Sequence, residues 1–121
     1  MQGIVFLGDK KLEIQDFDDP SPGPDDVIIE IKASGMCGSD LKFYRANNGP
    51  SSLGLGGDDK PVIAGHEPCG TIVEIGSNVP KKTFQLDTRV MQHHYEGCGT
   101  CSHCSTGWQQ LCIDGVKAVC G

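Results

Sequence analysis

The sequence predicts a single, mostly β domain with short helices and a cysteine-rich lobe near residue 100. Three observations lead to this expectation. Apolar and polar residues alternate over several short segments, as expected for half-buried strands. Glycine and proline, at 17 and 7 residues, are frequent enough to favour turns over long helices. Several of the seven cysteines are concentrated near the end of the chain, and 121 residues are enough for one domain.

The first half of the chain contains three expected strands. Residues 4–7 and 12–17 flank Gly8-Asp9, and this arrangement indicates a β-hairpin. Residues 27–33 alternate cleanly between apolar and polar side chains, which predicts a strand with one buried face.

One helix and two further strands are expected after that. Residues 40–46 form the only plausible helix in this part of the sequence, with Ser39 as its N-cap. Residues 71–75 and 88–92 are typical of strands, and the segment 49–60 is expected to be a loop because it is rich in Gly, Ser and Asp.

Composition excludes several classes of function. The chain has 10 Lys and Arg against 16 Asp and Glu, a net charge of −6, so it lacks the basic surface that nucleic-acid binding requires. No apolar run is long enough for a membrane span, and the first residues do not resemble a signal peptide. We therefore expect a cytoplasmic protein that binds no membrane, with cysteines that stay reduced.

Four cysteines predict a structural zinc lobe over residues 96–113. They follow the pattern C-x2-C-x2-C-x7-C, at Cys98, Cys101, Cys104 and Cys112. Four thiolates complete the tetrahedral sphere of zinc and leave no position for a substrate. An iron–sulfur run would have a last gap of three residues followed by proline, and here the gap is seven and Ile113 follows. Thiols without metal are the other alternative, and His103 is expected to be a solvated loop residue.

A second group of metal-binding residue types lies earlier in the chain. Cys37 follows one predicted strand and precedes the predicted helix, whereas His66 precedes another predicted strand. Both have glycine neighbours that permit close backbone approach. Spacing alone leaves two interpretations open. The two residues are either a small core cysteine and a structural histidine, or two ligands of one metal ion.

The order of the motifs favours the second interpretation. The chain contains Gly-x-Cys-Gly-Ser-Asp from residue 35, then Gly-His-Glu-x-x-Gly from residue 65, then the four-cysteine lobe. This combination resembles the N-terminal catalytic half of zinc-dependent alcohol dehydrogenases of the medium-chain dehydrogenase/reductase superfamily. The resemblance covers nearly the whole chain and implies a GroES-like fold, a distorted β-barrel with short helices.

The resemblance also implies roles for individual residues. Cys37 and His66 match two of the three protein ligands of a catalytic zinc, and Glu67 matches a carboxylate beside that metal. Ser39 matches the hydroxyl that bonds the substrate oxygen and starts a proton relay, although a helix N-cap is the simpler role. Asp40 matches the carboxylate that orients the ligand histidine, although it also suits the start of a helix.

The implied enzyme transfers hydride between an alcohol CH–OH group and NAD or NADP. Its zinc would lower the pKa of a bound hydroxyl or polarise a carbonyl, and its partners would be a small alcohol or carbonyl compound and, in the full-length enzyme, possible further copies of itself. We expect two zinc ions, one structural and one catalytic. A stand-alone zinc-binding module and a thiol or zinc sensor are the alternative functions.

The sequence departs from the family pattern in three places. The third catalytic ligand has no clear match, and we expect Glu67 or water rather than Cys120 to replace it, which would weaken that site. No Gly-x-Gly-x-x-Gly follows a strand, so we expect residues 1–121 to be a truncated catalytic domain without a nucleotide-binding Rossmann domain, and inactive alone. Asp87 stands where the family has glycine.

Three residues near these motifs are not assigned to the metal site. Cys69 is expected to be a small buried residue. His93 and His94 are adjacent, and on a strand their side chains would point to opposite faces, so at most one could face the site, and we assign neither.

Overall fold

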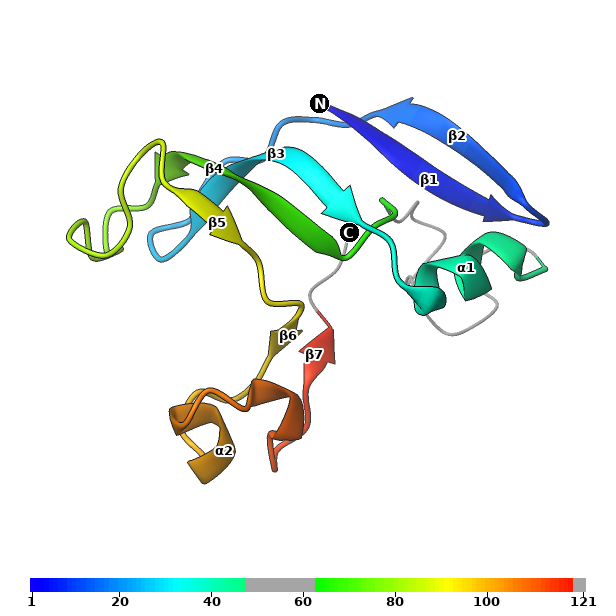
Figure 1. The fold of residues 1–121 in the computed structure, drawn as a ribbon. Helices are drawn as coiled ribbons and strands as arrows, with labels where there is room; N and C mark the ends of the chain where they lie inside the picture. Colours follow the sequence, from blue (N-terminus) through cyan, green and yellow to red (C-terminus); the bar gives the residue numbers. More distant parts are fainter. Residues whose placement is uncertain (48–62, 119–121) are drawn as a thin grey trace.

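The computed structural model describes residues 1–47 and 63–118, and it confirms a mostly β fold (Figure 1). The elements, in chain order, are β1 (Gln2–Gly8), β2 (Lys11–Asp16), β3 (Val27–Gly35), α1 (Gly38–Arg45), β4 (Glu67–Ile75), β5 (Arg89–Met91), β6 (Tyr95–Glu96), α2 (Ser102–Ser105), the 3-10 helix η2 (Gln109–Leu111) and β7 (Lys117–Ala118). They form three antiparallel sheets, with strand orders β1-β2, β3-β4-β5 and β6-β7. The expected loop at 49–60 lies outside the described residues.

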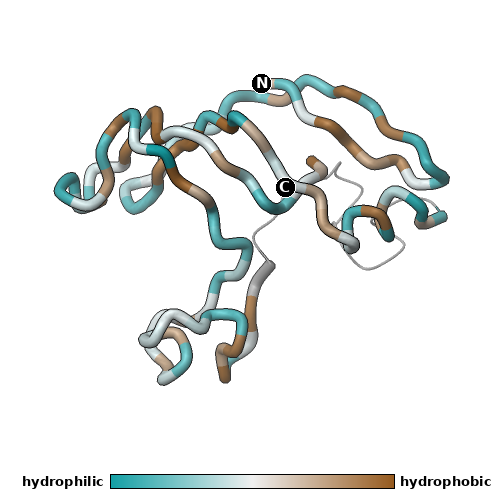
Figure 2. Tube along the Cα trace, in the orientation of Figure 1, coloured by the Kyte–Doolittle hydropathy of each residue, from teal (hydrophilic) through white to brown (hydrophobic). Residues whose placement is uncertain are grey.

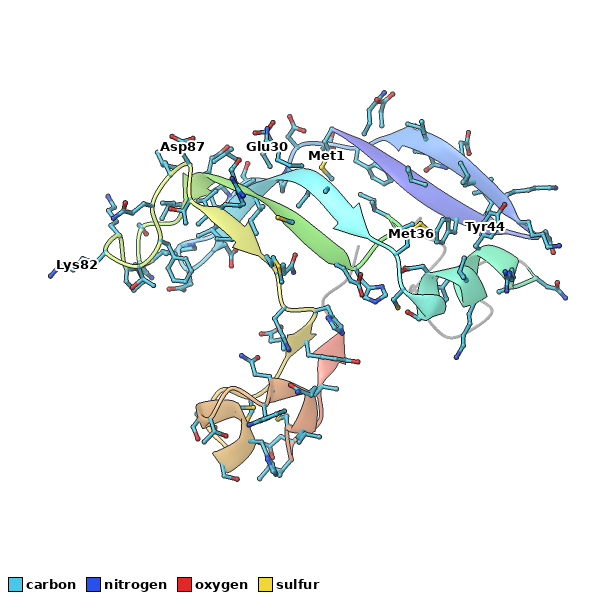
Figure 3. The ribbon with its side chains drawn as sticks, in the orientation of Figure 1. Met1, Glu30, Met36, Tyr44, Lys82 and Asp87 are labelled. Carbon is cyan, nitrogen blue, oxygen red and sulfur yellow. The ribbon has the colours of Figure 1, made fainter. Side chains whose placement is uncertain are left out.

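The β1–β2 hairpin packs against the end of α1. Its turn residues Asp9 and Lys10 have φ angles of 51° and 62°, the left-handed geometry that matches the twist of a two-residue hairpin turn. Their backbone N–H groups donate to the carbonyl oxygens of Ala46 and Tyr44, at 2.9 and 2.8 Å. The hairpin thereby satisfies carbonyl groups that the end of α1 would otherwise leave unpaired. Tyr44, which Figure 3 shows on α1 beside the hairpin, also contacts Phe6 of β1, with ring centroids 5.7 Å apart.

The three-stranded sheet brings the end of β3 next to the start of β4. Gly35, the last residue of β3, is paired with Glu67, the first residue of β4. The strand expected over 27–33 is present, but the predicted alternation of burial is wrong, because Ile31 is 50% exposed. Two shifts of register along the β3–β4 pairing interrupt the alternation, as β-bulges do.

Helix α1 begins earlier than the sequence predicts, with Cys37 and not Ser39 as its N-cap. The Cys37 Sγ atom accepts a hydrogen bond from the Ser39 N–H at 3.3 Å, and the Asp40 Oδ2 atom accepts one from the Cys37 N–H at 2.8 Å. The Cys37 Sγ atom also accepts from the backbone N–H of Asp40, and this bond together with the Cys37 N–H to Asp40 bond forms a capping box in which cysteine takes the place of serine. The Ser39 hydroxyl is therefore not the cap of this helix.

The cysteine-rich lobe is carried by the small β6–β7 sheet and contains α2 and η2, and Figure 1 shows it extending away from the three-stranded sheet. Figure 2 shows apolar residues along the strands, between turns that are largely hydrophilic. The buried apolar side chains of the described residues are Val5, Phe6, Ile72, Val79 and Cys104. No helix in the described ranges is long and apolar enough to cross a membrane.

Candidate metal centres

The four cysteines of the lobe converge on one point. The sulfur atoms of Cys98, Cys101, Cys104 and Cys112 all lie within 4.8 Å of one another. Tetrahedral zinc with bonds of about 2.3 Å requires sulfur–sulfur separations of about 3.8 Å, so small movements bring the four thiolates to one ion. The donor set fits a closed zinc site. His103 lies outside this group of ligands, as expected, but it is a half-buried residue of helix α2 rather than a solvated loop residue.

Backbone N–H groups and a glycine hold the sulfur atoms in place. The N–H groups of Cys98 and Cys101 donate to sulfur atoms of the group at 3.3 and 3.4 Å, and these bonds favour thiolate over thiol. A Cβ atom at Gly97 would overlap the Cys104 sulfur and lie 3.2 Å from the Cys112 Cβ. Glycine at this position therefore permits the first turn of the lobe to pass directly beside the ligands.

Without metal, the lobe thiols differ strongly in acidity. Hydrogen bonding from the Cys104 backbone N–H lowers the pKa of Cys101 to about 6, whereas burial raises the pKa of Cys104 to about 12. A buried thiol becomes a thiolate only when a positive charge compensates for lost solvation. A divalent cation bound to all four sulfur atoms would supply that charge.

The second centre contains Cys37, His66 and Glu67. The Cys37 Sγ atom lies 3.1 Å from the His66 Nε2 atom, and ligand atoms of all three residues lie within 4.8 Å of one another. Cys37 comes from the N-terminus of α1, whereas His66 directly precedes β4 and Glu67 is its first residue. The β3–β4 pairing therefore brings together residues that are far apart in sequence. A thiolate, an imidazole and a carboxylate fit zinc, and three protein ligands leave one position open.

Asp40 lies behind His66 and orients its ring. The Asp40 side chain is only 3% exposed, and its Oδ1 atom lies 3.1 Å from the His66 Nδ1 atom. Since its other oxygen accepts from the Cys37 N–H, this carboxylate fixes both residues at once. With Nδ1 paired to Asp40, the Nε2 atom of His66 faces the Cys37 sulfur, as a ligand nitrogen would.

Local hydrogen bonds and charges favour the thiolate form of Cys37 and the protonated form of His66. A hydrogen bond with the Ser39 hydroxyl, whose Oγ atom is 2.8 Å from Sγ, lowers the pKa of Cys37. Burial alone would lower the pKa of His66, but its hydrogen bond to Asp40 and the charges of Asp40 and Cys37 outweigh that effect and raise it. Ser39 thus contacts the sulfur directly, in a position where its hydroxyl can also meet a ligand of the metal.

A pocket of about 530 Å³ opens beside this centre. It is lined by Gly35, His66, Glu67, Pro68, Cys69, Met91, Gln92, His93 and His94. The pocket includes both His66 and Glu67 of the second centre, so its contents would adjoin a metal bound there. The two centres thus differ in their surroundings, since the four-cysteine site has no open ligand position and the second has one next to a pocket.

Three of these lining residues, Cys69, His93 and His94, were considered from sequence and left unassigned. His93 and His94 both line the pocket, and their rings are stacked 5.6 Å apart, so the expectation of opposite faces is wrong. The reason is that β5 ends at Met91, and strand alternation does not extend to the two histidines. The His94 ring lies 5.3 Å from that of His66. Cys69 is half-buried in the pocket wall rather than in the core.

Comparison with known proteins identifies the fold family. Residues 23–121 match the alcohol dehydrogenase GroES-like domain. The whole chain is 34% identical to an uncharacterized zinc-type alcohol dehydrogenase-like protein, YphC, of Escherichia coli and covers 34% of its length. Over 94% of the chain it is 35% identical to a sorbitol dehydrogenase of Bacillus subtilis, of which it covers 31%.

A solved structure supports the same assignment. A putative zinc-binding dehydrogenase from Sinorhizobium meliloti, determined bound to NADP, is 28% identical with a TM-score of 0.69, over 98% of this chain and 31% of that one. The chain thus spans about a third of the length of the relatives it matches. Because the family match covers most of the residues, the chain belongs to the alcohol dehydrogenase GroES-like domain family.

Proposed function

We propose that this chain provides the zinc-binding catalytic part of an NAD- or NADP-dependent dehydrogenase that acts on small alcohols or carbonyl compounds. The observation that carries the proposal is the second centre. Three residues of metal-binding type meet within 4.8 Å, and a buried carboxylate orients the histidine. A module that held only structural zinc would gain nothing from a second ligand group with an open position beside a pocket.

Each residue of the centre has a definite task in this proposal. Cys37, His66 and Glu67 would hold zinc, which when bound lowers the pKa of a hydroxyl group and polarises a carbonyl. Asp40 keeps the His66 Nε2 atom directed at the site. The Ser39 hydroxyl, next to the Cys37 sulfur, would bond the substrate oxygen and carry its proton away.

The pocket has groups that can bond additional substrate hydroxyls, although most of its wall is apolar. Gln92, His93 and His94 supply amide and imidazole groups to its wall, and such groups bind hydroxyls better than alkyl chains. The relative from Bacillus subtilis is named a sorbitol dehydrogenase, which supports the same substrate class. We therefore propose a small polyhydroxy alcohol as the substrate.

Cobalt substitution tests the proposal on this chain without a nucleotide cofactor. Cobalt(II) replaces zinc in tetrahedral sites, and its visible absorption responds to exchange of a ligand. We expect 2-mercaptoethanol, an alcohol analogue with a metal-binding sulfur, to change the spectrum through the open position. The lobe site is closed by four sulfur atoms and should give no response, so a Cys37→Ser variant, in which the lobe is intact, should lose the response. A response that persists in Cys37→Ser, or none in the parent chain, would refute the proposal.

A further inference from the structure

Gly35 lies directly opposite Glu67 in the β3–β4 pair, at the end of the sheet nearest the second centre (Figure 1). A Cβ atom built on Gly35 would overlap the Glu67 Oε2 atom and would lie 3.1 Å from the Glu67 Cβ atom. Facing Cβ atoms of paired strands are normally about 4.5 to 5.5 Å apart. The Glu67 side chain therefore occupies the space that a side chain at position 35 would fill.

This space permits the position that the Glu67 carboxylate takes. From there it reaches to within 4.8 Å of the ligand atoms of Cys37 and His66. Within the described ranges, no hydrogen bond or ion pair holds the carboxylate, and the residue is exposed. The free space over Gly35 is thus the feature that permits the carboxylate to turn towards the other two ligands.

Substitution at this position would affect the carboxylate more than the fold. The overlapping atom is the far end of a flexible side chain, which can rotate out of the way. Gly35 also has no left-handed φ angle, so alanine fits its backbone. A methyl group would displace the Glu67 carboxylate towards solvent, and a small shift between the two strands would relieve the 3.1 Å approach to the Glu67 Cβ atom.

We propose that Gly35 is a positioning residue: by having no side chain, it admits the Glu67 carboxylate to the metal centre as the third protein ligand. The proposal depends on the metal-binding part of the proposed function, because it concerns the ligand set of the same site. Strand β3 supplies no ligand to the second centre. Through Gly35, however, it controls whether that centre has two or three protein ligands.

Gly38 supplies a matched control. It is the first residue of α1 and follows Cys37 directly, and a Cβ atom there would meet nothing within 4 Å. A Gly38→Ala substitution therefore adds the same methyl group beside the same cysteine without touching Glu67. Any general effect of replacing a glycine near the centre would appear in both variants.

The test compares cobalt spectra and zinc affinities of the 121-residue chain carrying Gly35→Ala, Gly38→Ala, Glu67→Gln or the Gly35→Ala/Glu67→Gln pair. We expect Gly35→Ala and Glu67→Gln to weaken zinc binding at the second centre at least tenfold and to give the same altered cobalt spectrum. The double variant should be no weaker than either single variant, and Gly38→Ala should match the parent chain.

Three results would overturn the proposal. Gly35→Ala could bind zinc as the parent chain does, the double variant could be weaker than both single variants, or Glu67→Gln could leave affinity and spectrum unchanged. The last result is decisive even if Gly35→Ala does not fold, which circular dichroism would reveal. None of them affects the response lost in Cys37→Ser, so a failure here is distinguishable from a failure of the proposed function.

Discussion

Replacement of Asp40 by alanine is expected to destabilise the metal-free chain by at least about 3 kcal/mol, because two hydrogen bonds to its carboxylate are lost. The carboxylate accepts from the Cys37 N–H at 2.8 Å and pairs with the His66 Nδ1 atom at 3.1 Å, and it is 3% exposed. A hydrogen bond to a charged group contributes about 1.5 to 3 kcal/mol, and alanine leaves both partners without an acceptor. Loss of the helix cap acts in the same direction.

The assay is urea unfolding followed by far-ultraviolet circular dichroism, with a chelator present so that metal binding does not add to stability. Asp26→Ala is the matched control, because the exposed Asp26 carboxylate accepts one backbone N–H, from Gly23, at 3.1 Å. We expect that variant to lose less than about 1 kcal/mol. Zinc affinity at the second centre should also fall about 10- to 100-fold in Asp40→Ala, because His66 loses its orienting partner.

The reasoning is wrong if Asp40→Ala unfolds at the same urea concentration as Asp26→Ala. It is also wrong if the zinc affinity of Asp40→Ala equals that of the parent chain. Asp40→Asn provides a further check, since it keeps the side-chain volume and one acceptor oxygen. It should be less destabilised than Asp40→Ala and still bind zinc more weakly than the parent chain.

Three further outcomes are expected. Removal of zinc by a chelator should speed amide hydrogen exchange over residues 97–112 before it does so in β3 and β4, because the lobe depends on metal for order; equal protection before and after chelation would contradict this. Asp87→Gly should raise stability by about 0.5 kcal/mol in urea unfolding, because Asp87 has a φ of 62°, and a loss of stability would count against left-handed strain there. The 121-residue chain alone should reduce no NAD in the presence of sorbitol, and measurable turnover would show that a nucleotide site was missed.

The sequence predicted local features well. The spacing of the four lobe cysteines was sufficient because these ligands lie within 15 residues of one another, and their convergence requires only short turns. The hairpin was also evident, because its strands are joined by a two-residue turn. In both cases the relevant contacts are between residues that are close in the chain.

The second centre could not be derived from spacing, because it depends on strand pairing. Cys37 and His66 are 29 positions apart and meet only because the end of β3 is paired with the start of β4. Only the resemblance to a family connected them. The N-cap of α1 was misplaced because serine is the usual cap, whereas here a cysteine sulfur accepts the bond.

The histidine pair illustrates a different limit. Its misplacement followed from extending β5 by one residue, to Gln92, and from assuming that alternation continued beyond it. Strand ends are poorly defined by residue pattern, and a histidine directly after a strand can turn either way. Cys98, the first lobe cysteine, follows His94 by only four positions. This short spacing was the available signal that the chain leaves the strand before the two histidines.

The most direct test of the account is an anomalous difference map, collected at the zinc absorption edge from a crystal of the zinc-loaded chain. The account predicts two peaks, one among the four lobe sulfur atoms and one between the Cys37 Sγ and His66 Nε2 atoms, with Glu67 beside the second. A single peak, or a second peak away from Cys37 and His66, would contradict it.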